Sequence, residues 1–147
     1  MRAIRLIGCF LLVVLLACPS VAQRGPAPQG LSDFAQAAGL RDVAGFVDAV
    51  QTLRSAHQLP SRYVTKEAAT ARGWHGGGLC ALWPGHVIGG DQFHYFAAAL
   101  PNAPGRTYQE ADLDSDCRSC GAKRLIFSND GLIYLTVDHY NTFRPVP

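Results

Sequence analysis

Apolar residues in the segment that follows Asp42 recur at spacings of three and four, the period of one face of an α-helix. They are Val43, Phe46, Val47, Val50 and Leu53. Asp42 stands directly before them, where a side-chain oxygen can accept from a free backbone N–H of the first turn. Pro60 predicts the end of the segment, because proline does not continue a helix. The pattern therefore predicts a helix that buries one stripe against a core.

Two shorter helices are indicated by capping residues rather than by a long apolar stripe. Ser32 is a suitable N-cap for a helix that stops at Gly39. Thr65 is a suitable N-cap for another helix, which runs through Ala71 and meets a stop signal at Gly73.

The period changes from helical to strand-like after Gly89. Residues 107–113 and 123–128 alternate, and residues 132–137 are rich in β-branched and aromatic side chains. Residues 129–131 read Asn-Asp-Gly, which is a strong hairpin signal between the last two strands. Helices followed by antiparallel strands predict an α+β fold, with N-terminal helices packed on one face of a C-terminal antiparallel sheet.

The first 22 residues have the parts of a secretory signal peptide. Arg2 and Arg5 supply a positive start, residues 6–18 are apolar, and small residues lead to a cleavage site after Ala22. The apolar run of 13 residues is too short for a bilayer span, which takes about 18 or more. We therefore expect plain secretion without a membrane partner; the alternative is a lipoprotein signal in which Cys18 is acylated.

The rest of the chain divides in two and carries no excess of positive charge. We expect residues 23–41 to be a Pro- and Gly-rich tether with the first short helix, and residues 42–147 to be one domain. The full chain has 13 basic and 11 acidic residues, and loss of the signal arginines leaves 11 of each. A neutral surface disfavours a broad nucleic-acid footprint but leaves room for a small cationic site.

Cleavage after Ala22 leaves Cys80, Cys117 and Cys120 in the domain. In an exported protein, these three predict one disulfide and one spare thiol. Cys80–Cys117 is the pairing we prefer, and Cys80–Cys120 remains open. The Cys-x-x-Cys spacing of the last two also suits zinc or redox chemistry, but the sequence has no second such pair and no histidine nearby. We expect neither a metal nor another cofactor.

Acid–base chemistry is suggested by the strand that contains Glu110. A period of two places Tyr108, Glu110 and Asp112 on one face, while Arg124 belongs to the next strand and His139 follows the one after. Neighbouring strands lie about 5 Å apart, so these groups can converge on one phosphate. Cleavage of RNA without a metal needs such a set: a base, an acid and cations. Periodicity alone favours a plainer interpretation, a solvated sheet face with a salt bridge.

Several strings in a fixed order strengthen the chemical interpretation. They are LPSRYVTK at 59–66, GW at 73–74, PGHVIGGDQF at 84–93, LP at 100–101, GRTYQEAD at 105–112 and RLIFSNDGLIYLTVDHYNTF at 124–143. Together they resemble the barnase-like family of small secreted microbial guanyl-specific ribonucleases. The likeness runs from about Asp42 to Phe143. Each string alone is weak evidence, whereas the ordered set is strong.

The resemblance implies four catalytic residues. The family's general base falls on Glu110 and its general acid on His139, and its phosphate-binding cations fall on Arg124 and Lys66. It further implies the microbial ribonuclease fold and a secreted, monomeric endoribonuclease. Such an enzyme cleaves single-stranded RNA without a metal, by attack of the 2′-hydroxyl on the neighbouring phosphorus. A small acidic inhibitor protein is a possible partner.

The implied base site differs from the family's. Phe93 and Tyr140 match the aromatic positions that hold the base, and we expect His94 to contact substrate as well. In the loop that follows, the family's arginine and glutamate positions are Phe96 and Ala97. A methyl group cannot accept the hydrogen bonds that a carboxylate accepts from guanine, so a strict guanine preference is not expected.

The implied phosphate site is also altered. Cys120 stands where the family has a second phosphate-binding arginine, and we expect Arg118 to contact the substrate in its place. With fewer cations, the enzyme should be slower than its relatives. The alternative function is a weak or inactive ribonuclease-fold binding protein that docks through the aromatic 94–96 loop. A barely functional remnant of the fold is a further possibility.

Overall fold

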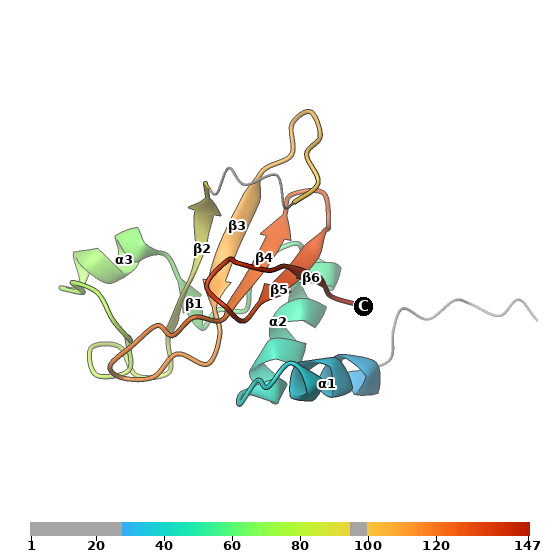
Figure 1. The fold of residues 1–147 in the computed structure, drawn as a ribbon. Helices are drawn as coiled ribbons and strands as arrows, with labels where there is room; N and C mark the ends of the chain where they lie inside the picture. Colours follow the sequence, from blue (N-terminus) through green and yellow to red (C-terminus); the bar gives the residue numbers. More distant parts are fainter. Residues whose placement is uncertain (1–27, 95–99) are drawn as a thin grey trace, which may run out of the picture.

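A computed structural model describes residues 28–94 and 100–147 as a sheet with helices packed against it (Figure 1). The elements in chain order are α1 (Pro28–Ala37), α2 (Val43–Ala56), β1 (Tyr63–Val64), α3 (Lys66–Ala71), β2 (Val87–Phe93), β3 (Tyr108–Asp112), β4 (Arg124–Ser128), β5 (Ile133–Thr136) and β6 (Arg144–Pro145). The expected signal peptide at 1–22, and Phe96 and Ala97, lie outside the described residues.

The six strands form one sheet in the order of the chain. β1 pairs with β2 in parallel, and each later strand is antiparallel to the one before. This arrangement confirms the predicted α+β fold. The predicted hairpin joins β4 to β5, and Gly131 at its turn has a φ of 97°. β1 and β6 have two residues each, too few to give a period-two pattern, and the sequence pattern misses them.

α2 has the predicted start but ends earlier than Pro60. The side chain of Asp42 accepts from the backbone N–H of Gly45, as expected of an N-cap. The last helical residue is Ala56, and His57 then adopts a left-handed conformation with a φ of 56° while its N–H donates to the carbonyl of Leu53. A C-cap of this kind ends a helix without proline, so the Pro60 stop was wrong.

α1 begins before its predicted cap. Its first residue is Pro28, so Ser32 lies inside the helix and does not cap it. The helix packs on α2, with the rings of Phe34 and Phe46 6.0 Å apart. α3 follows the prediction: Thr65 accepts from the N–H of Ala68 and caps it.

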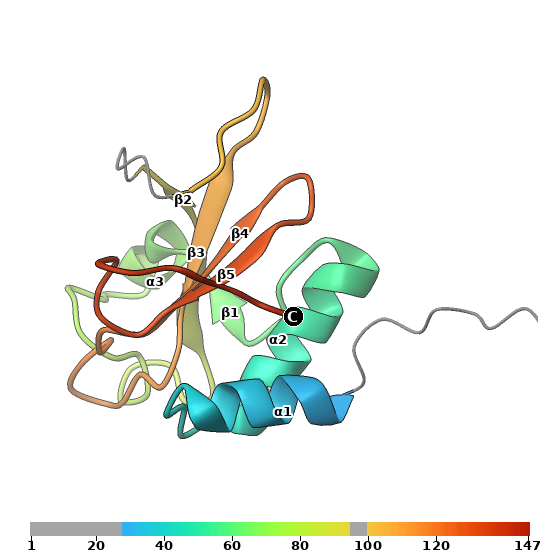
Figure 2. The ribbon, with the colours of Figure 1, turned by 45° about the vertical axis from the view of Figure 1, so that its right-hand side comes forward.

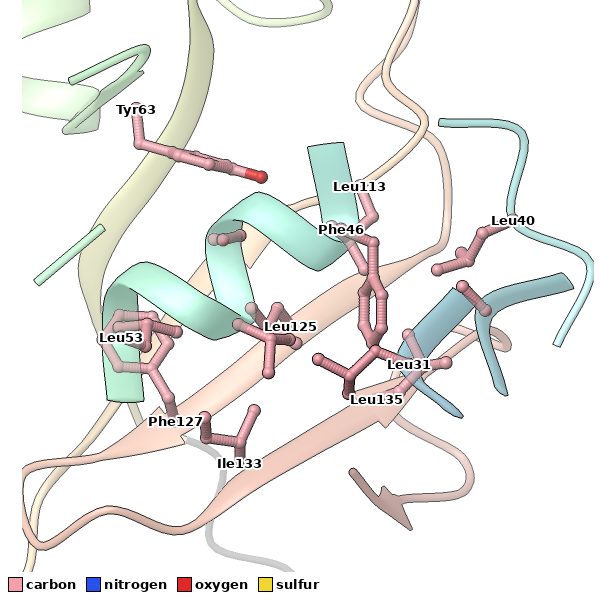
Figure 3. Packing of buried hydrophobic residues seen from close by; sticks show 14 residues of the cluster. Leu31, Leu40, Phe46, Leu53, Tyr63, Leu113, Leu125, Phe127, Ile133 and Leu135 are labelled. Atoms are coloured by element: carbon pink, nitrogen blue, oxygen red, sulfur yellow. The ribbon is translucent and has the colours of Figure 1, made fainter. Parts of the chain in front are cut away.

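The main core lies between α1, α2 and the sheet (Figure 2). Leu125 and Leu135 extend from β4 and β5 toward Phe46 of α2, and Phe127 lies near Leu53 (Figure 3). α3 lies at the β2 edge, away from α1 and α2 (Figure 2). The next residues along each strand face the other way, so the opposite face of the sheet is open to polar groups.

A disulfide joins two loops beside the sheet. It links Cys80, in the loop before β2, to Cys117, in the loop between β3 and β4, as preferred from the sequence. Cys120 is a free thiol. Within 28–94 and 100–147, no helix combines the length and apolar character needed to cross a bilayer.

Candidate active site

Glu110 is the centre of a polar cluster on the face of the sheet opposite the main core. It lies in the middle of β3, and only 9% of the residue is exposed. Lys66 donates from Nζ to Oε1 at 2.7 Å, and the Tyr140 hydroxyl donates to Oε2 at 2.6 Å. A buried carboxylate is costly unless it is paired, and here both oxygens have a donor.

Lys66 owes its position to the start of α3. The helix begins at this residue, directly after its cap Thr65. Asp91 of β2 accepts from the Lys66 backbone N–H with both carboxylate oxygens, each at 3.1 Å, which fixes the first turn of the helix against the sheet. The hydrogen bond to Glu110 raises the pKa of Lys66, against the opposing effect of burial. Lys66 is therefore a cation held beside the carboxylate.

His139 and Tyr140 lie in a turn after β5 with an unusual backbone. Both have positive φ, 57° and 71°, a conformation that costs energy in residues with a side chain. Asp138 holds the turn: its carboxylate accepts from the backbone N–H and hydroxyl of Thr142, at 2.9 and 2.6 Å. Thr136 accepts from the N–H of Tyr140 at 3.0 Å. This enforced turn is the kind of local strain that concentrates at functional sites.

The turn presents His139 beside the Glu110 cluster. The imidazole is 4.9 Å from the Tyr140 ring between centroids, and His139 is exposed. Tyr140 therefore contacts both predicted acid–base residues, Glu110 through its hydroxyl and His139 through its ring. The exposed imidazole of His139 is accessible to a substrate. The Glu110 carboxylate is buried and contacts Lys66 and Tyr140.

Arg124 forms a second, deeper part of the site. Its Nε lies 2.8 Å from Oδ1 of Asp112, the residue opposite it in the β3–β4 pairing, and both side chains are less than a tenth exposed. Burial raises the pKa of Asp112, and the charge of Arg124 opposes that shift. Oδ2 of Asp112 has no hydrogen-bond partner in the described part of the chain. The guanidinium carbon lies 5.9 Å from the centre of the Tyr140 ring, so Arg124 adjoins the Glu110 cluster.

Cys120 and Arg118 lie in the loop before β4. The Cys120 thiol donates to the carbonyl of Gly77 at 3.0 Å. Burial and the nearby Asp112 carboxylate raise the pKa of this thiol to about 12. Arg118 is exposed, and its backbone N–H donates to Asp116. Across 28–94 and 100–147, no contact holds the Arg118 guanidinium at the cluster, so the structure does not bring it to the site.

The predicted base-binding rings contact each other. The Phe93 and Tyr140 centroids are 5.3 Å apart, and the Phe93 and Phe143 centroids are 6.2 Å apart. A base between two rings requires roughly 7 Å, twice an aromatic contact distance of about 3.5 Å. A base would therefore have to separate Phe93 and Tyr140, or stack on an outer surface. His94 is exposed directly after Phe93, at the end of β2.

Sequence reasoning missed the network behind the site. It assigned Tyr140 to base stacking alone, considered a salt bridge on this face only as a solvated one, and gave no role to the turn-holding Asp138. Asp138 and Thr142 stand four residues apart around His139, a spacing that signals a side-chain-stabilised turn. The hydroxyl contact of Tyr140 has no such local signal. Among the residues with described positions, no group of three or more His, Cys, Asp or Glu side chains is placed to hold a metal ion.

Comparison with known proteins identifies the family. A family model described as ribonuclease matches residues 47–147. The ribonuclease of Heyndrickxia coagulans is 47% identical over 88 residues, covering 58% of this chain and 81% of that protein. The ribonucleases of Bacillus intermedius and Bacillus pumilus have the same identity over 88 residues, but the match spans only 54% of each. The chain belongs to the ribonuclease family.

Proposed function

We propose that this endoribonuclease cleaves single-stranded RNA by metal-independent transesterification, with Glu110 and His139 as its acid–base pair. Membership of the ribonuclease family gives the class of enzyme. The observation that carries the proposed residues is the buried Glu110 carboxylate held between Lys66 and Tyr140, beside an exposed histidine.

Each residue has a role that its position supports. Glu110 takes the proton of the 2′-hydroxyl as that oxygen attacks phosphorus, and His139 gives a proton to the departing 5′-oxygen. The bond to the 5′-oxygen breaks, leaving a 2′,3′-cyclic phosphate and a 5′-hydroxyl. Lys66 and Arg124 stabilise the negative charge that develops on the phosphoryl oxygens.

The test is cleavage of a single-stranded RNA in EDTA by the purified exported protein and by Glu110→Ala and His139→Ala. We expect each variant to lose at least about 100-fold in kcat/KM, the usual contribution of a general acid or base. Glu67→Gln, an exposed carboxylate on α3, and His75→Ala, an exposed loop histidine, are matched controls that should retain activity. DNA of the same sequence should stay intact, because it lacks the 2′-hydroxyl. Equal cleavage by wild type and both alanine variants would assign the activity to a contaminant.

The sequence departures support a relaxed base preference. Phe96 and Ala97 occupy the family positions of the arginine and of the guanine-reading glutamate. Phe93, Tyr140 and His94 supply aromatic surface, which stacks on any base. Product mapping on an RNA that contains all four bases should therefore show cuts after more than one base. Cuts exclusively after G would contradict this proposal.

The non-catalytic alternative is not favoured. The family is one of enzymes, and the Glu110 carboxylate is held by Lys66 and Tyr140 beside an exposed histidine, as an acid–base site requires. Arg118, away from the cluster, remains a proposed contact for more distant phosphates of the substrate.

Secretion and partners are further parts of the proposal. The Cys80–Cys117 disulfide suits an oxidising compartment outside the cytosol. N-terminal sequencing of the exported protein should find Gln23 first, after cleavage behind Ala22; a lipid on Cys18 would favour the lipoprotein route. We propose a monomer. A small acidic inhibitor would engage Lys66 and Arg124, and titration of activity with such a protein measures that contact.

A further inference from the structure

Two loops beside the active site are built to lie against each other. One contains residues 74–80 and the other residues 114–121, and they run side by side at the lower left of Figures 1 and 2. The Cys80–Cys117 disulfide joins them covalently. A Cβ on Gly77 would lie 2.8 Å from the Arg118 carbonyl oxygen, and a Cβ on Gly78 would clash with that of Asp116. Only glycines permit this close backbone contact.

The second loop supplies carbonyl acceptors for Arg124, whose Nε also pairs with Asp112 on the sheet. Nη1 of Arg124 donates to the carbonyls of Cys120 and Gly121, at 3.2 and 3.0 Å, and to that of Lys123 at 2.8 Å. Two of these three acceptors belong to the loop, close to the bridged Cys117. The position of the guanidinium therefore depends on two things, its pair with Asp112 and the place where the loop holds its carbonyls.

The tip of the 114–121 loop has few other anchors. At its start, the Asp114 carboxylate accepts from the backbone of Arg41 and from Lys123 Nζ. Residues 116–119, however, are all exposed. Besides the disulfide, the hydrogen bond from the Cys120 thiol to Gly77 joins the tip to the other loop. The covalent bridge is the strongest link between the tip and the rest of the domain.

We infer that the Cys80–Cys117 disulfide is a redox-sensitive positioning device for Arg124, which makes the oxidised enzyme more active than the reduced one. The inference rests on the proposed role of Arg124 in binding phosphate. Reduction by a dithiol breaks the S–S bond with two electrons and two protons; Cys80 and Cys117 become thiols and the reductant becomes a disulfide. The freed loop then no longer fixes the carbonyls that orient the guanidinium. The same chain is thus weaker in a thiol-reducing compartment than after export.

The free thiol of Cys120 does not readily attack the Cys80–Cys117 disulfide. Cys120 lies three residues from Cys117, close enough in sequence to attack the disulfide. The attacking species is the thiolate, and with a pKa raised to about 12 the Cys120 thiol stays protonated at neutral pH. Exchange to another pairing is therefore slow, and an external reductant is needed to open the bridge.

The test compares oxidised wild type, dithiol-reduced wild type and Cys80→Ser/Cys117→Ser on single-stranded RNA. We expect reduction and the double serine substitution each to lower kcat/KM about tenfold, mainly through kcat, because a displaced cation stabilises the transition state less. Reductant should leave the double-serine variant unchanged. Activities are compared per folded molecule, measured by circular dichroism; the fluorescence of Trp74 and Trp83, both in the segment that contains Cys80, should change on reduction.

Arg124→Ala separates the inference from the proposed function. If Arg124→Ala lowers kcat and reduction then has no further effect, the bridge acts through Arg124. If Arg124→Ala lowers kcat but reduction leaves the wild type fully active, the inference fails and the proposed function stands. If Arg124→Ala has wild-type activity, its proposed role fails.

A second measurement covers the case in which Arg124→Ala does not fold. Reduction of the wild type should increase amide hydrogen exchange in residues 114–124 and leave α1 and α2 protected. A uniform increase over the whole domain would mean that the bridge serves global stability alone, and would overturn the inference.

Discussion

The two faces of β3 and β4 differ in composition and in function: one is apolar and the other is polar. On one face, Ala111 and Leu125 are completely buried in the main core beneath α2. On the other face, Glu110, Asp112 and Arg124 are less than a tenth exposed, yet all have ionisable side chains. Apolar burial stabilises a fold, whereas buried charges cost free energy even when they are paired. The core face therefore stabilises the domain. The site face lowers its stability, because the proposed reaction needs ionisable groups at that place.

Substitution of Glu110 should affect catalysis far more than stability. We expect Glu110→Gln to lower kcat/KM by about 100- to 10,000-fold, because an amide does not act as a general base. The free energy of unfolding should change by less than about 1 kcal/mol, since Lys66 is half exposed and stays solvated without its partner. Urea unfolding and RNA cleavage of the same preparation measure both effects. A variant that unfolds but keeps its activity per folded molecule would remove the distinction between the faces.

Substitution on the core face should do the reverse. Leu125 is completely buried on β4, adjacent in sequence to Arg124. Leu125→Ala should lower the free energy of unfolding by about 2–5 kcal/mol through lost burial and a cavity. Below its melting temperature, its activity per folded molecule should remain near wild type. Leu82→Ala removes the same atoms from an exposed position and should cost less than about 0.5 kcal/mol.

The sequence predicted the core face better than the site face. Hydrophobic spacing and Asp42 located α2, and alternation located β3 and β4, because these signals act over a few residues. The hydrogen bond between Lys66 and Glu110 joins residues 44 apart in the chain and depends on where α3 meets the sheet. Only the family resemblance suggested that pair in advance. The contact of Tyr140 with Glu110 depends on a strained turn, which the Asp138–Thr142 spacing marks but does not orient toward Glu110.

The predicted start of α1 and the predicted end of α2 were wrong for reasons that lie in a few neighbouring residues. Ser32 is a good cap, but α1 continues on its N-terminal side to Pro28, so the helix did not need the cap at that place. Pro60 is a good stop, but His57 adopted the left-handed conformation first. In both cases the residue type was compatible with the predicted role, but α1 begins before Ser32 and α2 ends before Pro60.

The capping residue of α2 offers a smaller test on the core side. Asp42 accepts from the Gly45 N–H at 2.9 Å, so Asp42→Ala leaves that donor without its side-chain acceptor. We expect a loss of about 1 kcal/mol in the free energy of unfolding. The kcat on RNA should not change, because the cap lies on the α2 side of the sheet. Thermal unfolding and a cleavage assay at 25 °C check both statements; a kcat that falls with stability intact would contradict them.

The smallest expected effect is the pH dependence of two carboxylates, the exposed Asp130 and the buried Asp112. Hydrogen bonds from Arg106 and then Ser128 lower the pKa of Asp130 to about 2, whereas burial raises the pKa of Asp112. A lowered pKa means that the folded state prefers the ionised form. The contribution of Asp130 is therefore present above its ordinary pKa of about 4 and is lost as the pH falls toward 2. Asp130→Asn should unfold at a lower urea concentration than wild type at pH 6, and the two midpoints should converge between pH 4 and pH 2.

Asp112 should titrate above its ordinary value in a carboxyl NMR titration, the opposite direction, because its protonated form suits a buried site. If Asp112 titrated at its ordinary value, that carboxylate would be hydrated in solution, and burial would not be the property that separates the two faces.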